Sequence, residues 1–131
     1  MNRLHVVGAA VVSAGRVLAA RRGESRYPYV AHKFEFVGGK VEPGETEAQA
    51  LARELREELG VQARVGEHLM TVSHDYPDFS IELSVYFCTF LSDFSAHEHE
   101  ELRWMELSAL DPEEWAPADA PVVLALKAAA K

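Results

Sequence analysis

The sequence contains only one cysteine, Cys88, so no disulfide bond can form within the chain. Cys88 lies in an apolar stretch between Phe87 and Thr89, where a lone cysteine more often packs in a core than acts as a nucleophile. We therefore expect Cys88 to be a packing residue. A fold without disulfides has no need of an oxidising compartment.

The sequence also lacks long apolar runs, since no stretch approaches the roughly 18–20 apolar residues of a membrane span. Residues 1–20 have a basic start and many small apolar residues, as a signal peptide has, but residues 13–16 interrupt the run. Two short valine-rich runs around a glycine turn are more typical of a β-hairpin. We predict a cytoplasmic protein with no membrane partner.

Basic residues are scarce relative to acidic ones, with 13 Lys and Arg against 21 Asp and Glu and a net charge of −8. Such a surface is poorly suited to bind the phosphate backbone of DNA or RNA, so we predict no nucleic-acid partner. A small polyanionic ligand is still compatible with this net charge if metal ions and a few arginines offset the local negative field. The 131 residues suffice for one domain, spanning residues 1–131, and are too few for two.

Residues 39–61, GKVEPGETEAQALARELREELGV, combine a glycine-rich turn with the pattern of a helix. Thr46 is the expected N-cap, and the helix should end at about residue 59, before Gly60. Leucines at every fourth position form an apolar face that should pack on a core: Leu51, Leu55 and Leu59.

The same helix carries three carboxylates at spacings i, i+3 and i+4, which place Glu54, Glu57 and Glu58 on one face. Like charges at i, i+4 destabilise a helix by about 0.2–0.5 kcal/mol per pair. Hard divalent cations, which prefer oxygen ligands, would remove this repulsion. The alternative is an ordinary solvated helix face, rich in Glu and Arg.

This stretch resembles the Nudix box, a signature of glycine, glutamate and arginine at fixed spacing. Every fixed position is filled here, by Gly39, Glu45, Arg53, Glu54, Leu55, Glu57, Glu58, Gly60 and Val61. The resemblance covers essentially the whole chain. It implies hydrolysis of a phosphoanhydride bond in a nucleotide, with Mg²⁺ as the cofactor and Mn²⁺ as an alternative ion.

The resemblance also implies an α/β fold of the Nudix type, an α/β/α sandwich with a mixed β-sheet between helices. The residue pattern agrees, because a β-β-β-α-β-β-β-α order around one sheet buries both helices. Strands are expected at 4–12, 16–22, 33–37, 61–76, 79–91 and 102–107, with a turn at 38–39, a loop over 111–120 and a second helix at 121–131.

The resemblance assigns roles to individual residues of the box. The implied metal ligands are three carboxylates and a backbone carbonyl of the glycine turn: Glu54, Glu57, Glu58 and Gly38. Arg53 would orient a carboxylate by ion pairing, and Glu45 would brace the loop. The general base is a box glutamate or one on a distant loop, so Glu54 and Glu98 are both candidates.

Glu98 lies in the stretch Ala96-His97-Glu98-His99-Glu100, six residues before Trp104. Relatives carry a metal-binding or base glutamate at the corresponding place, which makes Glu98 a candidate for either role. The alternative is a solvated acidic loop. The two flanking histidines are weak support for a transition-metal site, because neither a cysteine nor a helical histidine pair accompanies them.

Beyond the box, residues 33–40, 75–78 and 116–121 resemble the MutT branch, whose members hydrolyse nucleoside triphosphates, notably 8-oxo-dGTP, and so clean the nucleotide pool. Phe36 and Tyr76 are candidates for packing on the base, although either residue fits a core equally well. Arg21 and Arg22 are neighbours on a strand, so only one of them can face a cleft, and the resemblance favours Arg22 for phosphate binding. The alternative is a basic strand end in water.

Asp119 departs from the MutT pattern, which has Asn at this position. An ionised Asp only accepts hydrogen bonds, which suits the N4 amine of cytosine better than a purine O6. Residues 96–99 and 116–119 also resemble the CTP pyrophosphohydrolase branch, which handles CTP and modified dCTP. A raised pKa in a dry pocket would weaken this argument, and helix capping is an alternative role for Asp119. Both substrates therefore remain open.

Two other functions are compatible with the pattern. One is a Nudix hydrolase of another derivative, such as a dinucleoside polyphosphate, an ADP-sugar or a pterin triphosphate. The other is a non-catalytic nucleotide-binding or regulatory domain, against which the complete glutamate set argues. The sequence leaves the choice between monomer and homodimer open.

Overall fold

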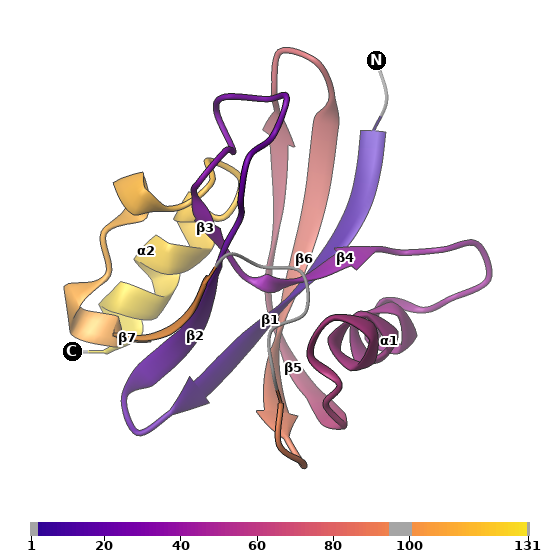
Figure 1. Ribbon diagram of the computed structural model, residues 1–131, viewed down its shortest axis with the longest axis vertical. Coiled ribbons are helices and arrows are strands. Elements are labelled where there is room, and N and C mark those ends of the chain that lie inside the picture. The colour runs from indigo at the N-terminus through magenta and orange to yellow at the C-terminus, as the bar shows by residue number, and fades with distance from the viewer. Residues whose placement is uncertain (1–2, 95–100, 131) are drawn as a thin grey trace.

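The computed structural model describes residues 3–94 and 101–130. Within these residues, seven strands form one mixed sheet, ordered β3-β2-β1-β6-β5, with β4 paired to β1 and β7 to β2. A helix lies on each side of the sheet (Figure 1), which confirms the predicted sandwich. The strands are β1 (Arg3–Ser13), β2 (Arg16–Arg21), β3 (Phe34–Glu35), β4 (Val37–Lys40), β5 (Ala63–Asp75), β6 (Ser80–Phe90) and β7 (Glu101–Glu106), and the helices are α1 (Glu47–Leu59) and α2 (Ala120–Ala129).

Strand β1 is the centre of the sheet, parallel to β6 and antiparallel to β4. Its side chains alternate between the two faces, so Val7, Ala9 and Val11 join the apolar cluster beneath α1, whereas Ala10 joins the cluster that includes residues of α2. Burial on both faces explains why the N-terminal run is almost continuously apolar.

Helix α1 begins and ends where the sequence predicts. The side chain of Thr46 accepts a hydrogen bond from the backbone N–H of Gln49, and the Gln49 side chain accepts one from the backbone N–H of Thr46. Gly60 ends the helix with a left-handed φ of 63°. The three leucines of the predicted apolar face are fully buried: Leu51, Leu55 and Leu59.

Helix α2 starts one residue before the predicted position and has Pro121 in its first turn. Val122, Val123 and Leu126 are buried, and they share an apolar cluster with Trp115. Within residues 3–94 and 101–130, no helix is long and apolar enough to cross a membrane.

The predicted strand over residues 33–37 and the turn at 38–39 need correction. The chain forms two short strands, β3 and β4, and the glycine pair lies within β4, opposite Gly8 and Val7 of β1. A Cβ atom on Gly38 would lie 1.9 Å from the carbonyl oxygen of Val7. Gly38 is therefore required for the close approach of two strands and not for a turn.

Two short 3₁₀ helices occupy the segment between β7 and α2, at Leu107–Ala109 and Pro112–Glu114. The second of them lies within residues 111–120, which the sequence predicts as a loop. The expected packing role of Cys88 is confirmed, because its side chain is buried and burial raises the pKa of its thiol to about 12.

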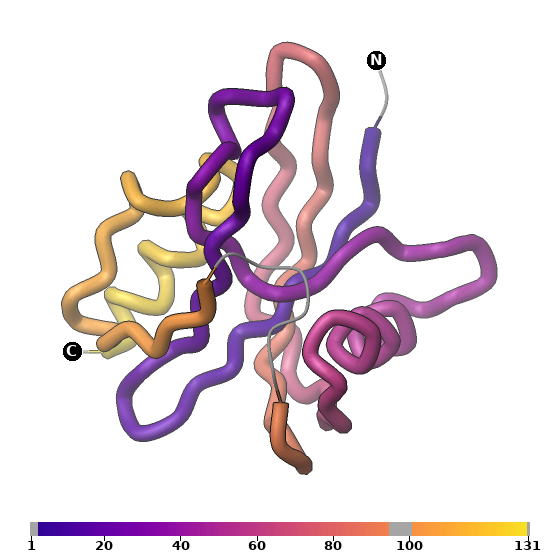
Figure 2. Tube along the Cα trace, in the orientation of Figure 1, coloured from indigo at the N-terminus to yellow at the C-terminus, as the bar shows by residue number. Residues whose placement is uncertain are grey.

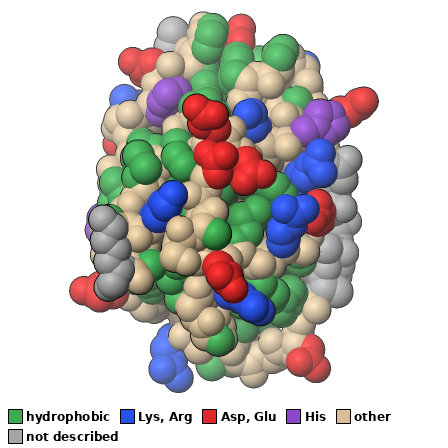
Figure 3. Space-filling model, turned by 90° about the vertical axis from the view of Figure 1, so that its left-hand side faces the viewer, with side chains coloured by type: hydrophobic (Ala, Val, Ile, Leu, Met, Phe, Trp, Pro, Cys, Tyr) green, Lys and Arg blue, Asp and Glu red, His purple; other side chains and the backbone are tan. Residues whose placement is uncertain are grey.

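Two segments far apart in the sequence lie side by side at one end of the molecule, as the tube in Figure 2 shows. One is the connection 22–33 between β2 and β3, and the other is the turn between β5 and β6. Figure 3 shows one face of the molecule, on which basic side chains stand singly or in small groups among acidic and apolar ones. The absence of a nucleic-acid partner stays a prediction.

Candidate active site

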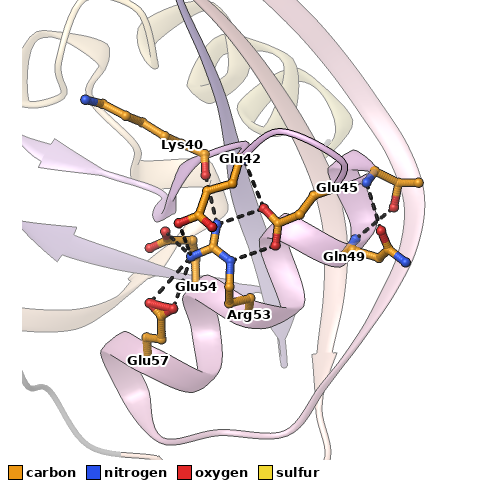
Figure 4. A network of polar contacts seen from close by, with 8 residues as sticks. Lys40, Glu42, Glu45, Gln49, Arg53, Glu54 and Glu57 are labelled. Carbon is orange, nitrogen blue, oxygen red and sulfur yellow. Dashed lines mark hydrogen bonds and ion pairs between the residues drawn. The ribbon is translucent and has the colours of Figure 1, made fainter.

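Arg53 lies at the centre of a network of carboxylates (Figure 4). Its Nε and Nη2 atoms donate to the two carboxylate oxygens of Glu45, at 2.7 and 2.9 Å. Its Nη1 atom donates to Glu54 at 2.8 Å and to Glu57 at 3.1 Å, and Nη2 also donates to the carbonyl oxygen of Lys40 at 3.0 Å. One guanidinium therefore joins the helix carboxylates to the loop that precedes α1.

The charges in this network stabilise one another. The hydrogen bonds to Glu45 and Glu54 raise the pKa of Arg53 further above its usual value. The hydrogen bond from Arg53, helped by the backbone N–H of Glu42, lowers the pKa of Glu45 to about 2. Glu45 therefore remains ionised at neutral pH. Its bonds to Arg53 tie the 40–45 loop to the helix, which is the bracing contact that the resemblance implies for Glu45.

The carboxylate of Glu54 lies directly over the strand β4. A Cβ atom on Gly39 would be only 2.4 Å from the carboxylate carbon of Glu54, so glycine is required at this position. The Glu54 side chain is 16 % exposed, whereas that of Glu57 is 54 % exposed. Glu58 lines the same cavity as the two glycines, Gly38 and Gly39.

Within the described part of the chain, no three acidic, histidine or cysteine side chains converge closely enough to hold a metal ion. The Nη1 atom of Arg53 pairs with both Glu54 and Glu57 and so keeps these two carboxylates near each other. The available donors are carboxylate and carbonyl oxygens, the set that hard ions such as Mg²⁺ and Mn²⁺ prefer. Gly39 also keeps side-chain atoms away from the Glu54 carboxylate. The residues therefore fit the predicted ion, and the ligand assignment stays a prediction.

A cavity of about 490 Å³ opens beside the carboxylate helix, a size within the usual range of about 300–1,000 Å³ for small-molecule sites. Six of the predicted site residues line it together: Arg22, Phe36, Gly38, Glu58, Tyr76 and Asp119. Three others, Arg53, Glu54 and Glu57, belong to the adjoining network. Glu98 lies outside the described residues, as do His97 and His99.

Asp119 is a buried acid that lines this cavity. Its Oδ2 atom accepts a hydrogen bond from the backbone N–H of Phe36 at 3.1 Å. The side chain makes no capping hydrogen bond to α2, so the helix-capping alternative is wrong. Burial, with the charge of Glu35, raises the pKa of Asp119 to about 8, although the Phe36 N–H and Arg22 act in the opposite direction. Asp119 is therefore mainly neutral at pH 7, and the argument from an ionised carboxylate applies only above about pH 8.

Phe36 and Tyr76 are both 5 % exposed, and each presents part of its surface to the cavity. Phe36 packs against Trp115, with ring centroids 4.7 Å apart. The hydroxyl oxygen of Tyr76 accepts a hydrogen bond from the backbone N–H of Ala118 at 2.9 Å. Both residues are thus parts of the core that also border the cavity, and their contact with a base stays a prediction.

The two neighbouring arginines at the end of β2 point to different places. Arg22 lines the cavity and donates to Glu35 at 3.1 Å. Arg21 instead pairs with Glu101 of β7 at 3.6 Å. The geometry therefore agrees with the choice of Arg22, whose contact with phosphate stays a prediction.

Sequence reasoning missed several polar residues that line the cavity: Arg26, Tyr27, Glu35, Lys40 and Asp78. Glu35 and Lys40 stand on either side of the glycine pair in the sequence, so their closeness to the box could have indicated that they line the site. Arg26 and Tyr27 lie in a connection without periodicity, and Asp78 lies in a turn. Only the folded chain brings these three side chains to the cavity.

Comparisons with known proteins agree with this geometry. The model of the family described as "NUDIX domain" matches residues 1–126. The chain is 38 % identical to a CTP pyrophosphohydrolase of Escherichia coli, over 98 % of this chain and 97 % of that protein. It is 34 % identical to an 8-oxo-dGTP diphosphatase of the same organism, over 76 % and 78 % of the two chains.

Solved structures give the same result for the fold. The solution structure of the E. coli ORF135 protein superposes with a TM-score of 0.83 at 39 % identity, covering 98 % of this chain and 94 % of that one. A MutT protein of Staphylococcus aureus superposes with a TM-score of 0.76 at 37 % identity, covering 98 % and 99 %. With its complete box and a matching fold, this chain belongs to the Nudix family of hydrolases.

Proposed function

We propose that this protein is a Mg²⁺-dependent nucleoside triphosphate pyrophosphohydrolase, which converts a nucleotide and water to the monophosphate and diphosphate. The observation that carries the proposal is the Arg53-centred carboxylate network beside a cavity that Asp119 and Glu58 line. The names of the two Escherichia coli relatives support the same reaction class.

Glu54, Glu57 and Glu58, with the carbonyl of Gly38, are the residues that would hold the ion. A divalent ion bound there would offset phosphate charge and acidify a coordinated water. Arg53 holds Glu54 and Glu57 in place through its hydrogen bonds. Glu54 or Glu98 would accept the proton of the attacking water, and the assignment of Glu98 rests on the sequence resemblance alone.

The cavity offers cationic, apolar and carboxyl groups to a nucleotide. Arg22, Arg26 and Lys40 line it and supply positive charge for the phosphates. Phe36 and Asp119 also line it, and an apolar ring and a single carboxyl group can receive a base. We infer that the phosphates lie next to the carboxylate helix, because Glu58 lines the same cavity.

Two base classes are each favoured by a particular observation. The match to the CTP pyrophosphohydrolase covers 98 % of this chain, against 76 % for the 8-oxo-dGTP diphosphatase, which favours cytosine nucleotides. The raised pKa of Asp119 favours the oxidised purine, because a neutral carboxyl can donate a hydrogen bond as well as accept one. We place CTP and modified dCTP first and 8-oxo-dGTP second.

The kcat/KM values for CTP, 5-methyl-dCTP, 8-oxo-dGTP and dGTP, with Mg²⁺ at pH 7 and pH 9, test this proposal. We expect the cytosine nucleotides to be preferred at both pH values. We also expect their preference over 8-oxo-dGTP to increase at pH 9, because Asp119 ionises and can then only accept from an amine. A preference for 8-oxo-dGTP that does not change with pH would reverse the base assignment. Hydrolysis of ADP-sugars or dinucleoside polyphosphates, but of none of the four, would overturn the proposal.

A further inference from the structure

Three tyrosine rings form a stacked row beside the cavity, which we call the tyrosine row (Tyr27, Tyr29 and Tyr76); of these, Tyr27 and Tyr76 line the cavity. The rings of Tyr27 and Tyr29 are 5.6 Å apart at 17°, and those of Tyr29 and Tyr76 are 4.8 Å apart at 12°. The guanidinium of Arg26 lies over the outer ring, 4.9 Å from its centroid. Phe79 lies in the β5–β6 turn, next to β6. Its ring packs against all three tyrosine rings, with centroids 5.1–6.5 Å apart. The row therefore leads from the 22–33 connection to the end of β5.

A hydrogen bond fixes the middle of this row. The Tyr29 hydroxyl donates to the Oδ2 atom of Asp78 at 2.7 Å, a short distance for a charge-assisted bond. Asp78 lies in the β5–β6 turn, so the bond joins the two segments that lie side by side in Figures 1 and 2. Burial and this hydrogen bond raise the pKa of Tyr29 to about 12, so the hydroxyl remains a donor at neutral pH.

The Tyr76 end of the row is connected to Asp119, the buried acid that lines the cavity. Tyr76 stacks on Tyr29, and its hydroxyl oxygen accepts from the backbone N–H of Ala118. Ala118 precedes Asp119, whose carboxyl accepts from the Phe36 N–H. The position of Tyr29 therefore influences the backbone that carries Asp119, through one ring contact and one hydrogen bond.

We propose that Tyr29, held by Asp78, is a positioning residue that determines how strictly the protein selects the base of its substrate. Tyr29 does not line the cavity in the described structure, whereas its neighbours Tyr27, Tyr76 and Asp78 do, so its effect must pass through such neighbours. The inference rests on the proposed function, because it assigns base recognition to the Asp119 end of the cavity. It adds a residue that affects base selection without lining the cavity.

The substitution Tyr29→Phe keeps the stacked ring and removes only the hydroxyl. We expect KM for the preferred nucleotide to increase about threefold to tenfold, the range that corresponds to losing one ordinary hydrogen bond. We expect the preference for that nucleotide over dGTP to fall by a similar factor. The kcat value should change less than about twofold, because the Arg53 network does not include Tyr29.

Variants of Asp78 provide the matched controls. Asp78→Ala removes the acceptor and should reproduce the effect of Tyr29→Phe, whereas Asp78→Asn keeps an acceptor oxygen and should restore most of the base preference. The double variant Tyr29→Phe/Asp78→Ala should be no worse than either single variant, because both remove the same bond. Independent effects that add in the double variant would contradict the proposal.

Binding of the product distinguishes this inference from the proposed function. The Kd values for CMP and GMP, measured by calorimetry, do not depend on hydrolysis. If the wild type selects between the monophosphates and Tyr29→Phe weakens that selection, the inference holds even where no triphosphate is hydrolysed. An unchanged CMP-to-GMP ratio, equal changes of KM and kcat for every nucleotide, or no binding of either monophosphate would overturn it.

Discussion

The substitution Glu57→Gln should lower kcat for the preferred nucleotide by about a hundredfold or more, with KM changed much less. A predicted metal ligand that loses its charge weakens the stabilisation of the developing phosphate charge, an effect of several kcal/mol. Glu57 is more than half exposed, so its replacement should leave the melting temperature nearly unchanged. Steady-state kinetics over a range of Mg²⁺ concentrations measures both kcat and the apparent affinity for the ion.

Glu42→Gln is the matched control, because Glu42 also faces Arg53, at 3.8 Å, but lies on the loop before α1 and not on its carboxylate face. This variant has the same change in net charge and should keep kcat within about threefold of the wild type. Equal losses in the two variants would mean that charge around Arg53, and not the helix face, supports catalysis. Full activity of Glu57→Gln would show that the catalytic assignment is wrong.

The substitution Asp119→Asn should stabilise the fold at neutral pH by an amount on the order of a few kcal/mol. In the folded protein, the pKa of Asp119 is raised from the ordinary value of 3.8 to about 8. The neutral acid therefore contributes stability that is fully present below about pH 4 and is lost as the pH rises through about 8. Asn does not ionise, and its side-chain oxygen can still accept from the Phe36 N–H.

Urea unfolding at pH 5 and pH 8 measures this difference. The wild type should lose stability relative to Asp119→Asn between the two pH values, and the variant should be the more stable at both. Glu114→Gln is the control for a charge removed nearby, because Glu114 is exposed in the segment before α2 and should change stability little. A pH-independent difference between the wild type and Asp119→Asn would show that Asp119 stays ionised in the fold.

The carboxylate helix was predictable because its signals are local. The cap at Thr46, the leucines at every fourth position and the glutamate spacing all lie within one stretch, and the structure places each of them as expected. The ion pair of Arg53 with the box carboxylates also followed from the resemblance.

The role of the glycine pair was not predictable, because it depends on a strand from elsewhere in the chain. Gly38 allows β4 to approach Val7, and Gly39 leaves room for the Glu54 carboxylate. A glycine pair alone looks the same whether it makes a turn or a close approach. The prediction of a turn was wrong for this reason.

Neither the protonation state of Asp119 nor the contacts of the tyrosine row could be predicted from the sequence. The pKa of Asp119 is set mainly by burial, which arises only when the 22–33 connection, the β5–β6 turn and the segment before α2 pack together. The pair Tyr29 and Asp78 is separated by 49 residues, and no periodicity connects them.

Product analysis of CTP and 8-oxo-dGTP hydrolysis by ³¹P NMR, with and without Mg²⁺, tests the central claim most directly. We expect the monophosphate and diphosphate as products, formed with Mg²⁺ and abolished by EDTA. Release of inorganic phosphate and a nucleoside diphosphate, or hydrolysis that continues at full rate in EDTA, would contradict the claim.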